Sequence, residues 1–185
     1  MPRSNTLNFF QIENGLRHAR ESCKDSGSGE LLRQLDEAAF VLEQASARAD
    51  SAYLAWREAI RLRLLAAKRL GLRFDGIRAE LAELDVPAQP RGRVSYWQPE
   101  LLLDAVQRLC EQVQALPSSE NLVDSEDSIQ WNKALESGAE ELRAALRHEE
   151  RCVEDYRRVA PLRRIAFARA QDAVDDFEAL TQDEE

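Results

Sequence analysis

Apolar side chains recur at seven-residue intervals through the first half of the chain, in two interleaved rows. The rows are Leu32, Ala39, Ser46, Tyr53, Ile60, Ala67, Phe74 and Leu81, and Leu35, Leu42, Ala49, Trp56, Arg63, Leu70, Ile77 and Leu84. Fourteen of these 16 positions are apolar. Steps that alternate between three and four residues are typical of a helix with a continuous packing seam. We therefore predict a long helix over about residues 30–84, with a bend or loose turn near Gly71 and Gly76.

The same spacing returns in the second half of the chain. Its rows are Gly138, Ala145, Cys152, Val159, Ala166, Ala173 and Leu180; Leu142, Tyr156, Ala170 and Phe177; and Ala139, Leu146, Val153, Ala160, Phe167 and Val174. They predict a second long helix over about residues 128–181, kinked near Val159 because Pro161 lies inside the pattern. Beside the first seam, five alanines at seven-residue intervals widen the apolar face, which favours a bundle over an isolated two-stranded coiled coil.

A shorter amphipathic segment precedes each long one. We predict short helices over about residues 5–24 and about residues 98–116, the second with Pro99 in its first turn, where proline is favoured. The first long helix should end before Pro87, because proline cannot continue a helix. Residues 117–127 are polar and acidic, and we predict a loop there.

These elements predict an all-α fold. We expect an elongated helical bundle of two hairpins with coiled-coil-like packing, each hairpin pairing a short helix with a long, heptad-patterned one. Hairpin 1 would span residues 1–92 and hairpin 2 residues 93–185, and together they would form one bundle. The halves also align with each other, Tyr53 meeting Tyr156 at an offset of 103 residues. An internal duplication and a chance alignment of heptad-rich helices both explain this alignment.

Composition agrees with a helical fold. The chain has 185 residues, only 6% of them aromatic, with 7 glycines and 6 prolines, which disfavours a β sandwich, a barrel or a disordered chain. A formal net charge of -9 disfavours a uniformly basic nucleic-acid binder.

The widely spaced Cys23, Cys110 and Cys152 indicate reduced thiols. Without a visible signal peptide or a run of ~18 apolar residues, we expect a soluble, cytoplasmic protein.

No pattern of residues in the sequence indicates a particular enzymatic reaction. Neither His18 nor His148 has a glutamate three residues before it, as a dinuclear metal site in a helical bundle requires. His148 and Cys152 have zinc-ligand spacing, although a histidine at the rim of the core beside a core cysteine is the better explanation. The chain has no nucleophile elbow and no glycine-rich phosphate loop. We therefore predict no catalytic, cofactor or metal site. A metal-dependent helical-bundle enzyme is the least favoured of the alternative functions.

Two segments concentrate positive charge. Residues 57–73 carry six bases and one acid, and residues 156–169 carry five arginines and no acid. If the long helices run parallel, both segments lie toward one Arg-rich end that would bind an acidic protein segment, anionic lipid or nucleic-acid phosphate. Neutralisation by nearby acids is the alternative. Three charged residues fall on the seam: Arg63, Glu149 and Arg163. A charged side chain on a packing face is either paired with an opposite charge or extends its head group into water. Such residues can also form a polar layer that fixes the register of the helices.

The sequence therefore predicts a non-enzymatic helical-bundle interaction protein, that is, a scaffold, adaptor or assembly subunit acting through its apolar seam and an Arg-rich end. Its partner would be another protein, a second copy of the chain, or both, and nucleic acid is disfavoured. An amphipathic coat at a lipid, granule or other anionic surface is the alternative. The candidate contact residues are Arg57, Arg61, Arg63, Arg69, Arg73, Arg157, Arg158, Arg163 and Arg164, with Tyr53, Trp56 and Trp97 as aromatic anchors. Ordinary core positions are the other explanation for the aromatic residues.

Overall fold

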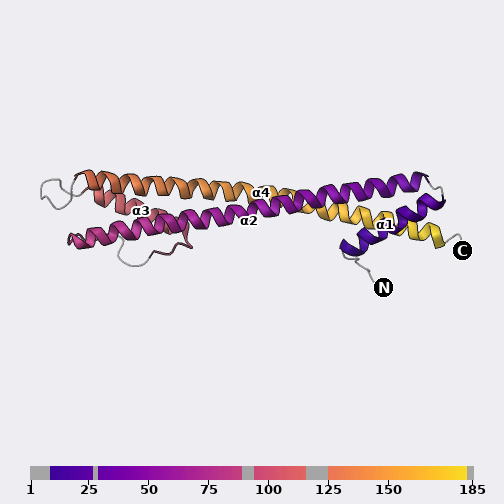
Figure 1. Ribbon diagram of the computed structural model, residues 1–185, viewed down its shortest axis with the longest axis horizontal. Coiled ribbons are helices and arrows are strands. Elements are labelled where there is room, and N and C mark those ends of the chain that lie inside the picture. Colours follow the sequence, from indigo (N-terminus) through magenta and orange to yellow (C-terminus); the bar gives the residue numbers. More distant parts are fainter. Residues whose placement is uncertain (1–8, 27–28, 89–93, 116–124, 183–185) are drawn as a thin grey trace. The chain divides into compact units, whose positions relative to one another are not determined.

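The protein is all-α throughout the segments that its computed structural model describes, which are residues 9–26, 29–88, 94–115 and 125–182. The helices are α1 (Phe9–Ser26), α2 (Gly29–Glu83), α3 (Pro99–Gln114) and α4 (Ser125–Gln182) (Figure 1). A short helix thus precedes a long one in each half of the chain, which confirms the fold class expected from the heptad pattern.

The helix ends lie close to the predicted ones, with one correction. Residues 125–127 belong to the first turn of α4 and not to an acidic loop, and the rest of that predicted loop lies outside the described residues. Acidic side chains are favourable there because the first turn exposes the positive end of the helix dipole. Helix α2 continues through Gly71 and Gly76, and α4 continues through Pro161.

Two compact units divide the chain, and each takes residues from both predicted hairpins. Unit 1 comprises residues 1–55 and 153–185, and unit 2 comprises residues 56–152. Each unit contains one short helix, part of α2 and part of α4. The division follows from helix length, because α2 and α4 are much longer than the short helices that precede them. The remainder of each long helix packs in the other unit.

Unit 1 combines α1 with the first part of α2 and the last part of α4 (Figure 1). Its core residues are Ile12, Leu16, Ala19 and Cys23 of α1, Leu35 and Leu42 of α2, and Ala166, Ala170, Val174 and Phe177 of α4. Gly15 allows α1 to approach α4 closely, because a Cβ atom at this position would lie 3.1 Å from Val174 Cγ1. Arg20 of α1 and Asp36 of α2 form an ion pair at 2.6 Å.

Unit 2 combines the last part of α2 with α3 and the first part of α4. Its core residues are Ala66, Ala67, Leu70, Phe74, Ile77 and Leu81 of α2, Leu102, Ala105, Val106, Leu109, Cys110 and Val113 of α3, and Leu135, Ala139 and Leu142 of α4. Tyr96 packs on Gly71, and its hydroxyl donates a 2.6 Å hydrogen bond to Asp75. The indole N–H of Trp131 donates a 2.7 Å hydrogen bond to Glu80.

Helices α2 and α4 run antiparallel within each unit. In unit 2, Arg63 pairs with Glu149, and Glu80 accepts a hydrogen bond from Trp131. Residue numbers therefore increase along α2 in the direction in which they decrease along α4. Unit 1 shows the same direction in the pairs Asp50–Arg163 and Tyr53–Tyr156. The parallel arrangement that would have gathered the arginines at one end is therefore absent from the described helices.

The two basic segments fall in different units. Residues 57–73 fall in unit 2, whereas residues 156–169 fall in unit 1. The parallel pairing of the long helices on which a single Arg-rich end depended is found in neither unit. The heptad pattern could not reveal this, because a seam of alternating three- and four-residue steps packs equally well against a parallel or an antiparallel neighbour.

Candidate interaction surface

A groove with an apolar lining lies between α2 and α4 in unit 1. Its volume is about 500 Å³. It is lined by Phe40, Val41, Gln44, Ala45 and Arg48 of α2 and by Val159, Leu162, Ile165, Ala166 and Arg169 of α4. We refer to this feature as the groove.

Large apolar side chains are exposed to solvent in the groove. Phe40 is 62% exposed, Leu162 is 47% exposed and Ile165 is 52% exposed. Single exposed apolar residues are ordinary on a protein surface, but several gathered in one concave site mark a binding surface. Ala166 is only 2% exposed and lies at the base of the groove.

Helix α1 covers a different face of the long helices. On α4, Ala170 and Val174 belong to the core that contains α1, whereas Ile165 lines the groove. Five residues separate Ile165 from Ala170, which corresponds to a rotation of about 140° around the helix axis. The long helices of unit 1 therefore pack against α1 on one side and expose the groove on another.

The groove carries positive charge and no acidic side chain. Its two charged residues are Arg48 and Arg169, both exposed. Neither guanidinium has an ion-pair or hydrogen-bond partner within the described ranges. Arg48 is the last groove residue of α2 and Arg169 the last of α4, so the antiparallel helices place one arginine at each end.

Most of the arginines predicted from the sequence are already paired inside their own unit. The pairs are Arg61–Glu58, Arg63–Glu149, Arg69–Glu141, Arg158–Asp155 and Arg163–Asp50, at N–O distances of 2.6 to 3.1 Å. The remaining candidates, Arg57, Arg73, Arg157 and Arg164, are exposed. Neutralisation by nearby acids, the alternative explanation for the basic segments, thus accounts for at least five of the nine arginines.

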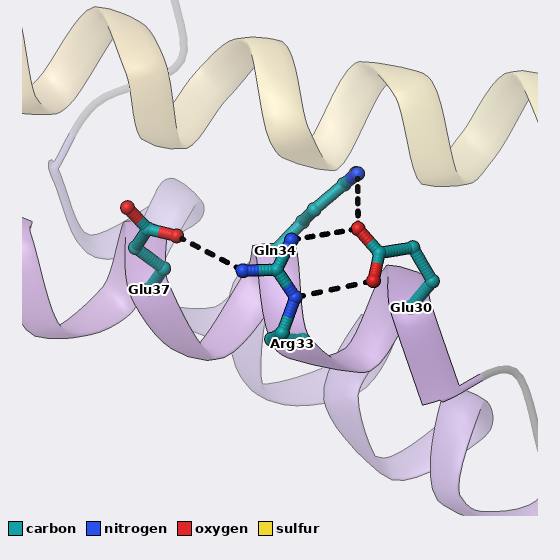
Figure 2. Close-up of polar contacts among 4 residues, drawn as sticks. All are labelled: Glu30, Arg33, Gln34 and Glu37. Carbon is teal, nitrogen blue, oxygen red and sulfur yellow. Dashed lines mark hydrogen bonds and ion pairs between the residues drawn. The ribbon is translucent and has the colours of Figure 1, made fainter.

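Charged side chains near the N-terminal end of α2 also form ion pairs with one another (Figure 2). Arg33 lies between Glu30 and Glu37, at N–O distances of 2.7 and 3.8 Å. Gln34 donates a 3.4 Å hydrogen bond to the same Glu30 carboxylate. The hydrogen bond from Arg33 lowers the pKa of Glu30. Exposed pairs of this kind stabilise a helix only slightly, and here they leave Arg33 already partnered.

The predicted aromatic anchors occupy different environments. Tyr53 is 41% exposed and packs on Tyr156, with 5.7 Å between the ring centroids. Trp56 is half-buried on α2, and Trp97 is 76% exposed just before α3. Trp97 alone combines high exposure with a large ring.

Most of the apolar seam lies inside the two units. Leu35 and Leu42 are buried in the core of unit 1, and Leu70, Phe74 and Leu81 are buried in the core of unit 2. The seam charge Arg63 is paired with Glu149 at 2.6 Å, and each side chain remains about a fifth exposed (20% and 23%). These seam residues are therefore engaged within the chain.

The cysteines and histidines form no metal centre in the part of the chain that the structure describes. Cys152 Sγ lies 3.9 Å from both ring nitrogens of His148, and Cys152 is buried. Burial raises the pKa of the Cys23 thiol, and burial together with nearby Glu136 raises that of Cys110. Raised thiol pKa values are typical of unreactive core cysteines.

The groove was missed in the sequence because its large exposed apolar residues fall outside the heptad rows. Leu162 and Ile165 belong to none of the three rows of the second half, and Phe40 lies beside the seam of the first. A search for apolar residues outside the rows would have found all three. Only the pairing of α2 with α4 shows that they share one site.

Comparison with known proteins yields no relative for this chain: no family model matches, and neither the curated proteins nor the solved structures contain a match. Among the described helices, none has both the length and the apolar content required to cross a membrane. The function of the groove therefore has to be inferred from its own residues.

Proposed function

We propose that this chain is a non-enzymatic helical interaction protein, a scaffold, adaptor or assembly subunit, that binds a protein partner in the groove of unit 1. The observation that carries the proposal is the gathering of Phe40, Leu162 and Ile165 in one concave site with an unpaired arginine at each end. Apolar centres bordered by charged residues are the usual construction of protein–protein interfaces. The proposal replaces the buried seam with the groove as the contact surface.

An amphipathic coat at a lipid or other anionic surface receives less support. Such a coat lays the apolar faces of its helices on the surface. The apolar faces of α2 and α4 supply residues to both cores, so that coating would require the two units to open.

Photo-cross-linking in the cells that make the protein tests the proposal. A benzoylphenylalanine placed at Ile165 should give a discrete protein adduct, because this side chain lies in the groove. The same unnatural residue at Ile129, which is 66% exposed on α4 in unit 2, gives the background from random collisions.

The adduct at position 165 should disappear when Leu162 is changed to Glu, which places a charge inside the apolar site. Circular dichroism should show that Leu162→Glu stays folded, because Leu162 is 47% exposed. A protein that gives no adduct at position 165, or the same adducts at positions 165 and 129, does not use the groove for binding.

A further inference from the structure

We propose that the partner in the groove is a second copy of this chain, docked so that the two α4 helices pack antiparallel about a two-fold axis. This inference rests on the proposed function and identifies its partner. It follows from a stripe of exposed residues on α4 whose chemistry is complementary to itself.

The stripe begins in the groove and continues beyond it. Its residues are Leu162, Ile165, Arg169, Asp172, Asp176 and Leu180. They follow one another at steps of three and four residues, so they lie along one face of α4. All are exposed, and the stripe changes from apolar and basic in the groove to acidic and apolar toward the C-terminal end of α4.

Reversal of the stripe places complementary groups opposite each other. In the antiparallel register that sets Arg169 against Asp176 of a second copy, Ile165 lies against Leu180 of that copy. The two-fold axis repeats both contacts, as it must in an isologous interface. The interface thus contains two Arg–Asp contacts and two apolar contacts, and it brings the two Asp172 carboxylates together beside the axis, where their repulsion opposes docking.

The charged groups of the stripe are available for these contacts. Asp176 is exposed and, like Arg169, has no ion-pair or hydrogen-bond partner within the described ranges. Leu180 is 56% exposed and Ile165 is 52% exposed, so docking removes both from water. Burial of apolar area stabilises the dimer and the Arg–Asp contacts select its register.

The groove has the shape that this docking requires. Its walls are two antiparallel helices, with α1 on another face, and a groove of that kind accepts a further helix. On α2 the lining extends from Phe40 to Arg48, which corresponds to about 12 Å along the helix axis at about 1.5 Å per residue. Two turns of a helix fill that length. A lipid with a single anionic head group would match only one of the two arginines.

Charge reversal on the full-length chain tests the proposal. Light scattering on a sizing column should show a concentration-dependent dimer for the unmodified protein. Arg169→Asp sets two pairs of aspartates against each other, and Asp176→Arg sets two pairs of arginines against each other. Each single variant should weaken the dimer about 10- to 100-fold, because two attractive contacts become two repulsive ones.

Mixing supplies the decisive measurement. Equal amounts of Arg169→Asp and Asp176→Arg chains should form a mixed dimer, because every contact across the axis then joins an arginine to an aspartate. The double variant R169D/D176R should also recover the dimer. The matched control Arg147→Asp reverses an exposed arginine of α4 in unit 2 and should leave the dimer unchanged.

The remaining outcomes overturn the proposal. A monomer at every concentration, or single variants that dimerise like the unmodified chain, excludes docking through the α4 stripe. Binding to vesicles of phosphatidylcholine and phosphatidylglycerol by a monomeric chain would identify the groove as a lipid site instead. If the chain is monomeric but the adduct at position 165 contains a different protein, the partner inferred here is wrong while the proposed function stands.

Discussion

At the scale of single residues, Gly71 marks the closest approach between two segments of unit 2. A methyl group at this position would overlap the ring of Tyr96, whose hydroxyl donates a hydrogen bond to Asp75. We expect Gly71→Ala to displace the ring, remove that hydrogen bond and lower the free energy of unfolding by about 2 kcal/mol. Urea denaturation followed by circular dichroism measures this change.

Gly76 provides the matched control in the same helix. A Cβ atom at Gly76 has nothing within 4 Å, so Gly76→Ala meets no obstacle. Alanine is favoured over glycine inside a helix, and the free energy of unfolding should rise by about 0.5–1 kcal/mol. If both variants gain stability, the contact between Gly71 and Tyr96 does not constrain the fold.

At the scale of helices, Arg63 and Glu149 join α2 to α4 in unit 2. Their side chains are largely removed from water, so removal of one leaves the other with a poorly solvated charge. We expect Glu149→Leu to lower the free energy of unfolding by about 1–2 kcal/mol, and R63L/E149L to recover most of that loss. A double-mutant cycle by urea denaturation measures the coupling.

The exposed pair of Glu58 with Arg61 is the reference for that cycle. It lies within one helix, and both side chains are at least half exposed (50% and 65%). Glu58→Leu should leave the free energy of unfolding nearly unchanged, because water screens an exposed pair. Equal losses at positions 58 and 149 would show that burial of the seam pair has no energetic consequence.

The sequence predicted the helices and most of their buried faces, because a heptad repeat defines both at once. Leu35, Leu42 and Phe74 are buried as that repeat requires. The heptad repeat predicts neither the relative direction of the long helices nor the groove. Direction depends on which long-range pairs form, such as Asp50 with Arg163. The groove depends on side chains outside the repeat that only the pairing of α2 with α4 brings together.

At the scale of the whole molecule, two continuous helices are shared by the two units. Residues 55 and 56 both lie in α2, and residues 152 and 153 both lie in α4, where the division falls. Each unit joins a short helix, the beginning of the long helix that follows it and the end of the other long helix. This repeated plan is what a duplicated hairpin would produce.

Shared helices should make the two units unfold together. All three tryptophans, Trp56, Trp97 and Trp131, belong to unit 2, so tryptophan fluorescence reports on that unit. Leu42 is buried in the core of unit 1, and Leu42→Ala should cost about 2–5 kcal/mol. We expect the fluorescence midpoint in urea to fall together with the midpoint from circular dichroism.

A fluorescence midpoint that stays in place while the circular dichroism transition splits would show independent unfolding of the units. The reciprocal substitution checks the same coupling from the other side. Leu109→Ala in the core of unit 2 should lower both midpoints as well.

Pro161 lies between Val159 and Leu162 in the α4 wall of the groove. Proline has no N–H, so the carbonyl of Arg157 lacks the donor that an uninterrupted helix would supply four residues later. Arg157 is exposed, and water can solvate that carbonyl. The curvature of α4 can therefore change at this point without breaking a main-chain hydrogen bond. The width of the groove can therefore change at this point, and in the proposed dimer the docked helix would help to set it.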